Sequence, residues 1–167
     1  MHYIRLPKSM LLASLLTFVF LNLSASTSSC ETGANTYLNS SGMDYKTMAW
    51  NDAIAAGIPA QLFVNQINQE SGFNPSAYSS EGAQGIAQIM PKTAQSWQVN
   101  AWNPEEALRV AANHMHWYYQ HYGYDYAKAL ACYNGGCARL EWAIQNCLNF
   151  YWCLYPETRH YIDVIMG

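Results

Sequence analysis

The chain has 167 residues, which is enough for one compact domain but not for two. Only 11% of the residues are charged, the formal net charge is −3, and the basic residues form no run, which excludes the clustered positive charge that binds nucleic acids or anionic bilayers. Thirteen Tyr and six Trp are many for this length, and such side chains either fill a core or line a groove with flat apolar faces.

The N-terminus has the pattern of a secretory signal peptide. His2, Arg5 and Lys8 supply a basic start, and small residues follow the apolar stretch behind it. That stretch, residues 10–23, is too short to span a bilayer comfortably. We therefore expect residues 1–25 to be removed during export to the periplasm or cell envelope.

Residues 26–42 are polar and small, which predicts a flexible lead-in to one folded domain over residues 43–167. Beyond residue 25 the chain has six Lys and Arg against eleven Asp and Glu, a net charge of −5, so a neutral glycan suits it better than a polyanion. An uncleaved membrane anchor is an alternative. A lipoprotein modified at Cys30 is another, although the residues before Cys30 match the usual lipobox poorly.

Five cysteines in a small exported chain indicate disulfide bonds. Cys30 is the odd one, and the other four allow three pairings among which the sequence does not choose. A zinc site is disfavoured because the C-x-x-C pairs typical of such sites are missing. His114 and His116 lie two positions apart on a predicted helix and point in different directions, so we expect ordinary packing or surface roles for them and no metal. The four clustered cysteines are Cys132, Cys137, Cys147 and Cys153.

Apolar residues at spacings of three and four predict a helical domain. Pro59 and the Asn103-Pro104 pair are good helix starts. Gly57 and Gly123 are good helix stops. No alternating strand pattern of useful length is present, so the fold class is all-α or α-dominant. The predicted helices cover residues 45–56, 59–69, 90–98, 104–122, 125–134, 138–150 and 156–166.

The candidate catalytic group is Glu70. Phe63, Gln66 and Ile67 lie on one face of the preceding helix. Glu70 continues this face at the C-terminal end of the helix, where partial desolvation and the negative end of the helix dipole both raise the pKa of a carboxyl group. A carboxyl group with a raised pKa can act as a general acid near neutral pH. The alternative is a glutamate that merely ends the helix and points to water.

Three ordered segments resemble those of a known family. Residues 70–73 read ESGF, and residues 82–94 read GAQGIAQIMPKTA. Further on, residues 129–136 read ALACYNGG and residues 157–162 read ETRHYI. This set resembles the soluble lytic transglycosylases, which share a lysozyme-like fold with goose-type lysozymes. The resemblance implies a lysozyme-like single domain.

The resemblance also implies an activity, cleavage of the β-1,4 bond between MurNAc and GlcNAc in peptidoglycan. Glu70 is the position that matches the single catalytic glutamate of the family. In the family this residue protonates the glycosidic oxygen and then takes the proton from the sugar's own 6-hydroxyl, which attacks the anomeric carbon. The product is a 1,6-anhydro end, and no cofactor or metal is implied.

The same motifs imply six substrate-binding residues, for each of which a structural role is the alternative: a core methionine, packed tyrosines or an asparagine that caps a helix. The residues before one of these tyrosines depart from the family pattern, because Cys132 stands where the family has an alanine. Glu157 and Arg159 are interpreted as a structural ion pair that positions Tyr161. The six are Ser71 beside Glu70 or the substrate's acetamido group, Gln88 and Met90 against the sugar, Tyr133 and Asn134 at the cleavage site, and Tyr161 close to Glu70.

Two other functions stay open. A hydrolytic lysozyme would use water as the attacking group, with Glu81 or Asp125 as the candidate second carboxylate. A wall-binding factor without catalysis would fit an envelope-spanning secretion or conjugation machine, although the retained Glu70 argues against it. Peptidoglycan is the expected partner for all three functions: transglycosylase, lysozyme and wall-binding factor. Components of such a machine are further candidate partners of a chain that we expect to be monomeric.

Export supplies a first testable prediction. Since the N-terminus has a basic start and a short apolar run, the mature protein should lack roughly the first 25 residues. Mass spectrometry of the protein recovered from the cell envelope fraction measures this directly. An intact Met1 in the mature protein would reject the interpretation, and a diacylglycerol adduct on Cys30 would favour the lipoprotein alternative.

Overall fold

The computed structural model describes Leu38 and residues 42–167, all within the unit Asn35–Gly167. The predicted signal peptide, Cys30 and most of the predicted lead-in lie outside the described residues. Within the described part of the chain, no helix combines the length and the apolar character that crossing a membrane requires.

The described residues form α-helices, one short 3-10 helix and isolated bridges, with no strand among them. This confirms the predicted all-α fold class. The helices are α1 (Tyr45–Ala56), α2 (Ala60–Ser71), α3 (Pro91–Trp97), α4 (Pro104–His121), α5 (Tyr126–Gly135), α6 (Cys137–Asn146), the 3-10 helix η1 (Phe150–Cys153) and α7 (Pro156–Met166).

Side-chain caps explain where three of the α-helices begin. Asp44 accepts a hydrogen bond from the Thr47 amide at 2.8 Å and caps α1, and Asp125 caps α5 in the same way. Asn103 accepts from the Glu106 amide at 3.3 Å at the start of α4, as the sequence predicted. Each cap satisfies an amide that has no partner inside its helix.

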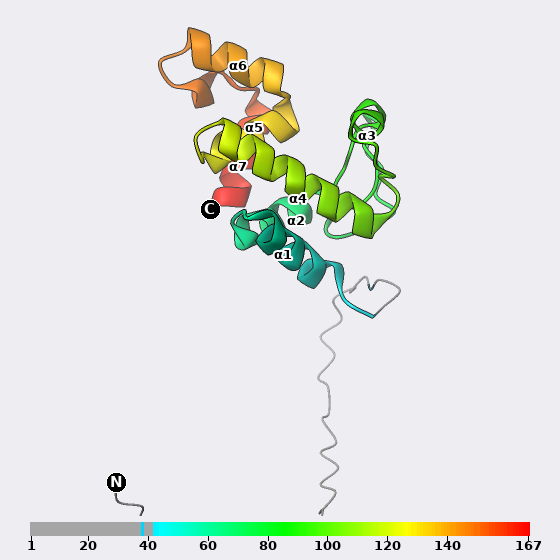
Figure 1. Ribbon diagram of the computed structural model, residues 1–167. Helices are drawn as coiled ribbons and strands as arrows, with labels where there is room; N and C mark the ends of the chain where they lie inside the picture. The colour runs from blue at the N-terminus through cyan, green and yellow to red at the C-terminus, as the bar shows by residue number, and fades with distance from the viewer. Residues whose placement is uncertain (1–37, 39–41) are drawn as a thin grey trace, which may run out of the picture. The chain divides into compact units, whose positions relative to one another are not determined.

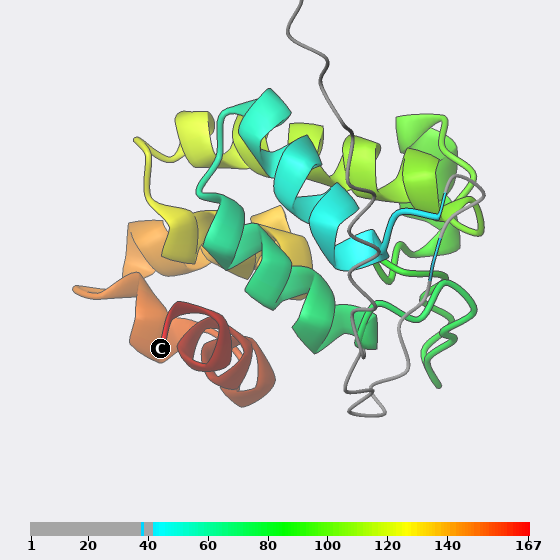
Figure 2. The same cartoon turned by 90° about the horizontal axis from the view of Figure 1, so that it is seen from below.

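Helix α2 packs between α1 and α7, while the long helix α4 packs against α1 and α5 (Figures 1 and 2). The side chains of Phe63, Gln66 and Ile67 are fully buried, which confirms that this face of α2 points into the core. The C-terminal end of α2 therefore brings Glu70 out of the core at a fixed position.

The helix predicted over residues 138–150 is wrong at its end. Helix α6 stops at Asn146, and Cys147 has extended backbone angles. A disulfide joins Cys147 to Cys153, and the side chain of Asn149 accepts from the Tyr151 amide at 3.0 Å, so the chain turns into η1 instead of continuing α6. Apolar spacing alone carried no sign of this turn.

Gly85 shows why the loop between α2 and α3 needs a glycine. Its φ angle is +70°, and a Cβ atom added there would lie 1.9 Å from the Ala101 carbonyl oxygen. A loop glycine can let the backbone approach a ligand closely. The close neighbour is instead the backbone of the segment before α4.

Gly85→Ala should therefore destabilise the protein more than Gly72→Ala does. Gly72 has a similar φ of +61° but no atom within 4 Å of an added Cβ, so it carries only the left-handed penalty of about 1–2 kcal/mol. The clash at Ala101 should add on the order of 1–3 kcal/mol. Denaturant unfolding measures both free energies, and equal losses would contradict the close packing described here.

Candidate active site

The carboxyl group of Glu70 lines a cavity and has a strongly raised pKa. It lies in the last turn of α2, and burial raises its pKa to about 7, against the opposing effect of a hydrogen bond from Tyr161. A group with this pKa is about half protonated at neutral pH, so it can both donate a proton and take one back. The alternative of a glutamate that points freely to water is therefore wrong.

Tyr161, on α7, donates its hydroxyl proton to the Oε1 atom of Glu70. Burial and the negative charge of Glu70 raise the pKa of Tyr161 well above its ordinary value, so this hydroxyl stays a donor. The structure thus places Tyr161 where the sequence predicted, although 91 residues separate the two positions.

Three successive carbonyl groups of the loop after α2 are held by side chains that the sequence analysis had singled out. Ser71 donates to the Ile86 carbonyl at 2.6 Å, and Tyr133 donates to the Ala87 carbonyl at 2.7 Å. The Gln88 amide donates back to the Gly85 carbonyl at 2.8 Å. These bonds fix residues 85–88, called the loop floor below, beside Glu70.

The prediction for Ser71 is therefore corrected in one respect. Its hydroxyl proton is directed at Ile86 and not at Glu70. The hydroxyl oxygen retains its acceptor lone pairs, so a contact with a substrate N–H stays a prediction. The residue joins the end of α2 to the loop floor and so helps to fix the two relative to each other.

Glu70 opens into a cavity of about 450 Å³. Its walls come from the end of α2, the following loop, the end of α5 and the start of α7. Four of the predicted substrate-binding residues contribute to these walls, whereas Ser71 and Tyr161 do not. The lining residues are Glu70, Ser79, Glu81, Ala83, Gln88, Met90, Tyr133, Asn134 and Glu157.

Asn134 and Glu157 both line the Glu70 cavity, but their side-chain contacts differ from those that the sequence suggested. The side-chain oxygen of Asn134 accepts from Thr158 at 2.8 Å, which ties the end of α5 to α7. Glu157 was expected to pair with Arg159, but it faces the cavity, and Arg159 donates to the Trp152 carbonyl at 3.1 Å. The ion-pair interpretation is therefore wrong.

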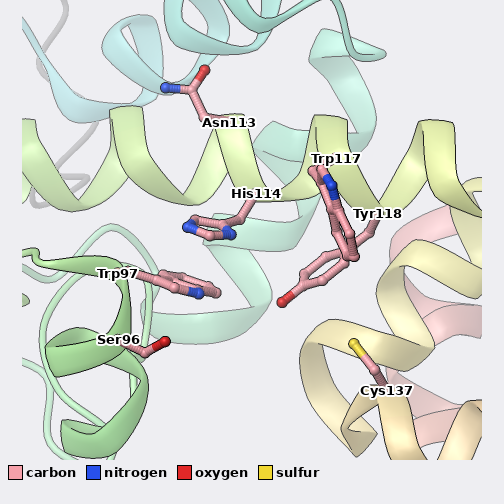
Figure 3. A pocket seen from close by; sticks show the side chains of 7 residues that line it. All are labelled: Ser96, Trp97, Asn113, His114, Trp117, Tyr118 and Cys137. Carbon is pink, nitrogen blue, oxygen red and sulfur yellow. The ribbon is translucent and has the colours of Figure 1, made fainter.

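The cavity continues into two further depressions and becomes a groove. A depression of about 220 Å³ shares Gln88, Met90 and Tyr133 with the Glu70 cavity. Beyond it, a pocket of about 520 Å³ shares Trp97, Tyr118 and Cys137 with this depression (Figure 3). A groove of this kind fits an extended ligand rather than a small compact one.

The far pocket is walled by aromatic rings. Figure 3 shows Trp97 of α3 facing His114 of α4, and the two rings stack with centroids 3.8 Å apart. Trp117 is more than half exposed beside them. Burial lowers the pKa of His114, so the stacked imidazole is neutral at pH 7. The sequence predicted a packing or surface role for this histidine. It could not identify Trp97 as the stacking partner, because Trp97 lies in another helix.

Among the described residues, no group of three or more His, Cys, Asp or Glu side chains is arranged to hold a metal ion. Asp125, one of the two carboxylates considered as a second acid, caps α5 and lies 3.1 Å from the Lys128 ammonium. Glu81, the other, lines the Glu70 cavity. Hydrogen bonds lower the pKa of Glu81, so it is ionised at neutral pH.

Comparison with known proteins gives a consistent result. A family model described as the transglycosylase SLT domain matches residues 47–149. The transglycosylase of Enterobacteria phage PRD1 is 32% identical over 105 residues, which are 59% of this chain and 39% of the phage protein. The soluble lytic murein transglycosylase of Escherichia coli K12 is 28% identical over 100 residues, which are 53% of this chain and 16% of that enzyme. The chain thus spans less than half the length of either relative.

Solved structures show the same fold. The lytic transglycosylase Slt of Pseudomonas aeruginosa, solved as an inactive mutant, superposes with a TM-score of 0.63 at 20% identity, over 72% of this chain and 22% of that one. The 70 kDa soluble lytic transglycosylase of Escherichia coli gives a TM-score of 0.61 at 23% identity, over 74% and 23%. These likenesses confirm the predicted lysozyme-like fold.

The hydrogen bond from Tyr161 should have a measurable effect on the pKa of Glu70. Because this hydrogen bond favours the ionised carboxylate, Tyr161→Phe should raise the pKa of Glu70 above its value of about 7. Titration of the carboxyl carbon by NMR measures the change. Tyr151→Phe is the control, since Tyr151 donates to Asp163 on the outer side of α7. An unchanged or lowered pKa in Tyr161→Phe would show that the bond has no such role.

Proposed function

The chain belongs to the transglycosylase SLT domain family, and we propose that it is a peptidoglycan lytic transglycosylase. It cleaves the β-1,4 bond between MurNAc and GlcNAc and leaves 1,6-anhydro-MurNAc ends. The observation that carries the proposal is the buried Glu70 carboxyl, which has a pKa of about 7 and lines the groove.

The reaction needs only this one titratable group. Protonated Glu70 gives its proton to the glycosidic oxygen as the bond from that oxygen to the anomeric carbon breaks. The 6-hydroxyl oxygen of the same sugar then bonds to the anomeric carbon, and its proton returns to ionised Glu70. No water is consumed, and the acid is restored for the next turnover.

The rest of the groove supplies binding. Gln88 and Asn134 offer amide groups to sugar hydroxyl and acetamido groups beside the reacting carboxyl. Met90 and Tyr133 offer apolar surface there. The far pocket, with Trp97 among its rings, gives more distant sugars of the strand a surface to stack on. This division of roles supports a polymeric glycan as the substrate.

The solved relatives support the role of Glu70 by analogy. The Pseudomonas structure is of an inactive mutant in which a glutamine replaces a glutamate. A similar loss is expected here, because an amide cannot take part in proton transfer. We further propose that the chain is exported and acts as a monomer in the envelope. Components of a secretion or conjugation machine are candidate partners there.

Hydrolysis is the second candidate reaction, and Glu81 is the observation that favours it. This ionised carboxylate lines the same cavity as Glu70 and would be available to activate a water molecule. Glu81 is exposed on the loop and accepts one hydrogen bond from Ser80 at 2.6 Å. The transglycosylase reaction needs only Glu70 and so explains the site with fewer groups.

Glu70→Gln tests the proposal. Release of muropeptides from purified peptidoglycan should fall by about 100- to 10,000-fold, because the amide can neither donate nor accept the transferred proton. Sedimentation with insoluble cell wall should show binding retained, since the groove walls are unchanged. Glu105→Gln, on the exposed start of α4, is the matched control and should keep wild-type activity.

Glu81→Gln separates the two reactions in the same assay. Near wild-type cleavage by this variant fits the transglycosylase, whereas a loss as large as that of Glu70→Gln would favour hydrolysis with two carboxylates. Wild-type cleavage by Glu70→Gln would overturn both.

A further inference from the structure

The disulfide between Cys132 and Cys137 lies in the wall of the groove. It spans the junction of α5 and α6, which carries Tyr133 and Asn134. Both half-cystines line the depression next to the Glu70 cavity. The bond therefore closes a small loop that contains two of the residues proposed to face the substrate.

Two glycines follow Asn134 where the chain passes from α5 to α6, and Gly135 is the last residue of α5. Gly136 has a φ of +83°, and glycines lose more conformational freedom on folding than other residues. Gly135 is required for packing, since an added Cβ would lie 2.8 Å from the Thr158 hydroxyl. A covalent bond across such a segment removes much of its freedom.

The position of Tyr133 in turn affects Glu70. Its hydroxyl donates to the Ala87 carbonyl, and its side chain lines both the Glu70 cavity and the depression beside the disulfide. Burial and the negative charge of Glu70 raise the pKa of Tyr133 well above its ordinary value, and both residues line the same cavity. Displacement of Tyr133 would expose more of the Glu70 carboxyl to water.

We infer that the Cys132–Cys137 disulfide is a positioning element for the reaction, which holds Tyr133 and Asn134 against the Glu70 cavity and keeps water from the carboxyl on that side. The inference rests on the proposed function. The role belongs to this disulfide alone, because the bond between Cys147 and Cys153 joins the end of α6 to η1, and neither of its residues lines the groove.

The two disulfides give a matched pair of variants. In the Cys132→Ala, Cys137→Ala variant, kcat on soluble peptidoglycan glycan strands should fall on the order of 10-fold, because a misplacement of about 1 Å can cost up to about 100-fold. KM should rise as well, because Tyr133 and Asn134 are proposed to bind the substrate. In the Cys147→Ala, Cys153→Ala variant, the melting temperature should fall but kcat should stay at the wild-type value.

The pH profile gives a readout that a general loss of stability would not move. Water admitted to Glu70 reduces the burial that raises its pKa, so the pKa should fall back toward its ordinary value. The limb in which activity declines with rising pH should then move to lower pH in the first variant only. Equal kcat and an unmoved limb in a folded first variant would overturn the inference.

A reduction experiment tests the inference even if the Cys132→Ala, Cys137→Ala variant does not fold. In the Cys147→Ala, Cys153→Ala background, dithiothreitol delivers two electrons and two protons to the one remaining disulfide among the described residues. Activity should fall on reduction and return on reoxidation, and unchanged activity with titrated free thiols at Cys132 and Cys137 would contradict the inference. An oxidised wild type that cleaves no peptidoglycan would instead reject the proposed function itself.

Discussion

The burial of one carboxyl group, that of Glu70, is the constraint on which the site depends. A carboxylate in water would be ionised at neutral pH and could not donate a proton. Desolvation at the end of α2 moves the pKa to about 7, and the Tyr161 hydroxyl keeps it from rising further. The helix packing around α2 therefore serves to hold a titratable group in a place that disfavours its charge.

The surroundings of Glu70 are built mainly by hydrogen bonds to backbone. Ser71, Gln88 and Tyr133 each hold a carbonyl of the loop floor, and Thr158 holds Asn134 from α7. Residues that the motifs associate with substrate thus also shape the cavity, and the two roles use different atoms. A hydroxyl or amide that donates to the loop still has acceptor atoms for a ligand.

Much of the helical fold could be predicted from local sequence patterns. The cap at Asn103 and the buried face of α2 depend on residues close in sequence, and both were predicted correctly. Contacts between distant segments were not accessible in this way. The stack of Trp97 on His114 and the approach of Ala101 to Gly85 depend on how separate segments pack. The four clustered cysteines pair with near neighbours, five and six positions apart, but the sequence left three pairings open. Periodicity within one helix carries no information about its neighbours.

The central claim is that Glu70 works alone, as acid and then as base, without water as a reactant. Mass spectrometry of muropeptides released from purified peptidoglycan in ¹⁸O-labelled water tests this most directly. The account predicts products with 1,6-anhydro ends, each lacking one water relative to a reducing end and carrying no label from the solvent. Reducing ends that contain ¹⁸O would contradict it and establish hydrolysis at the same groove.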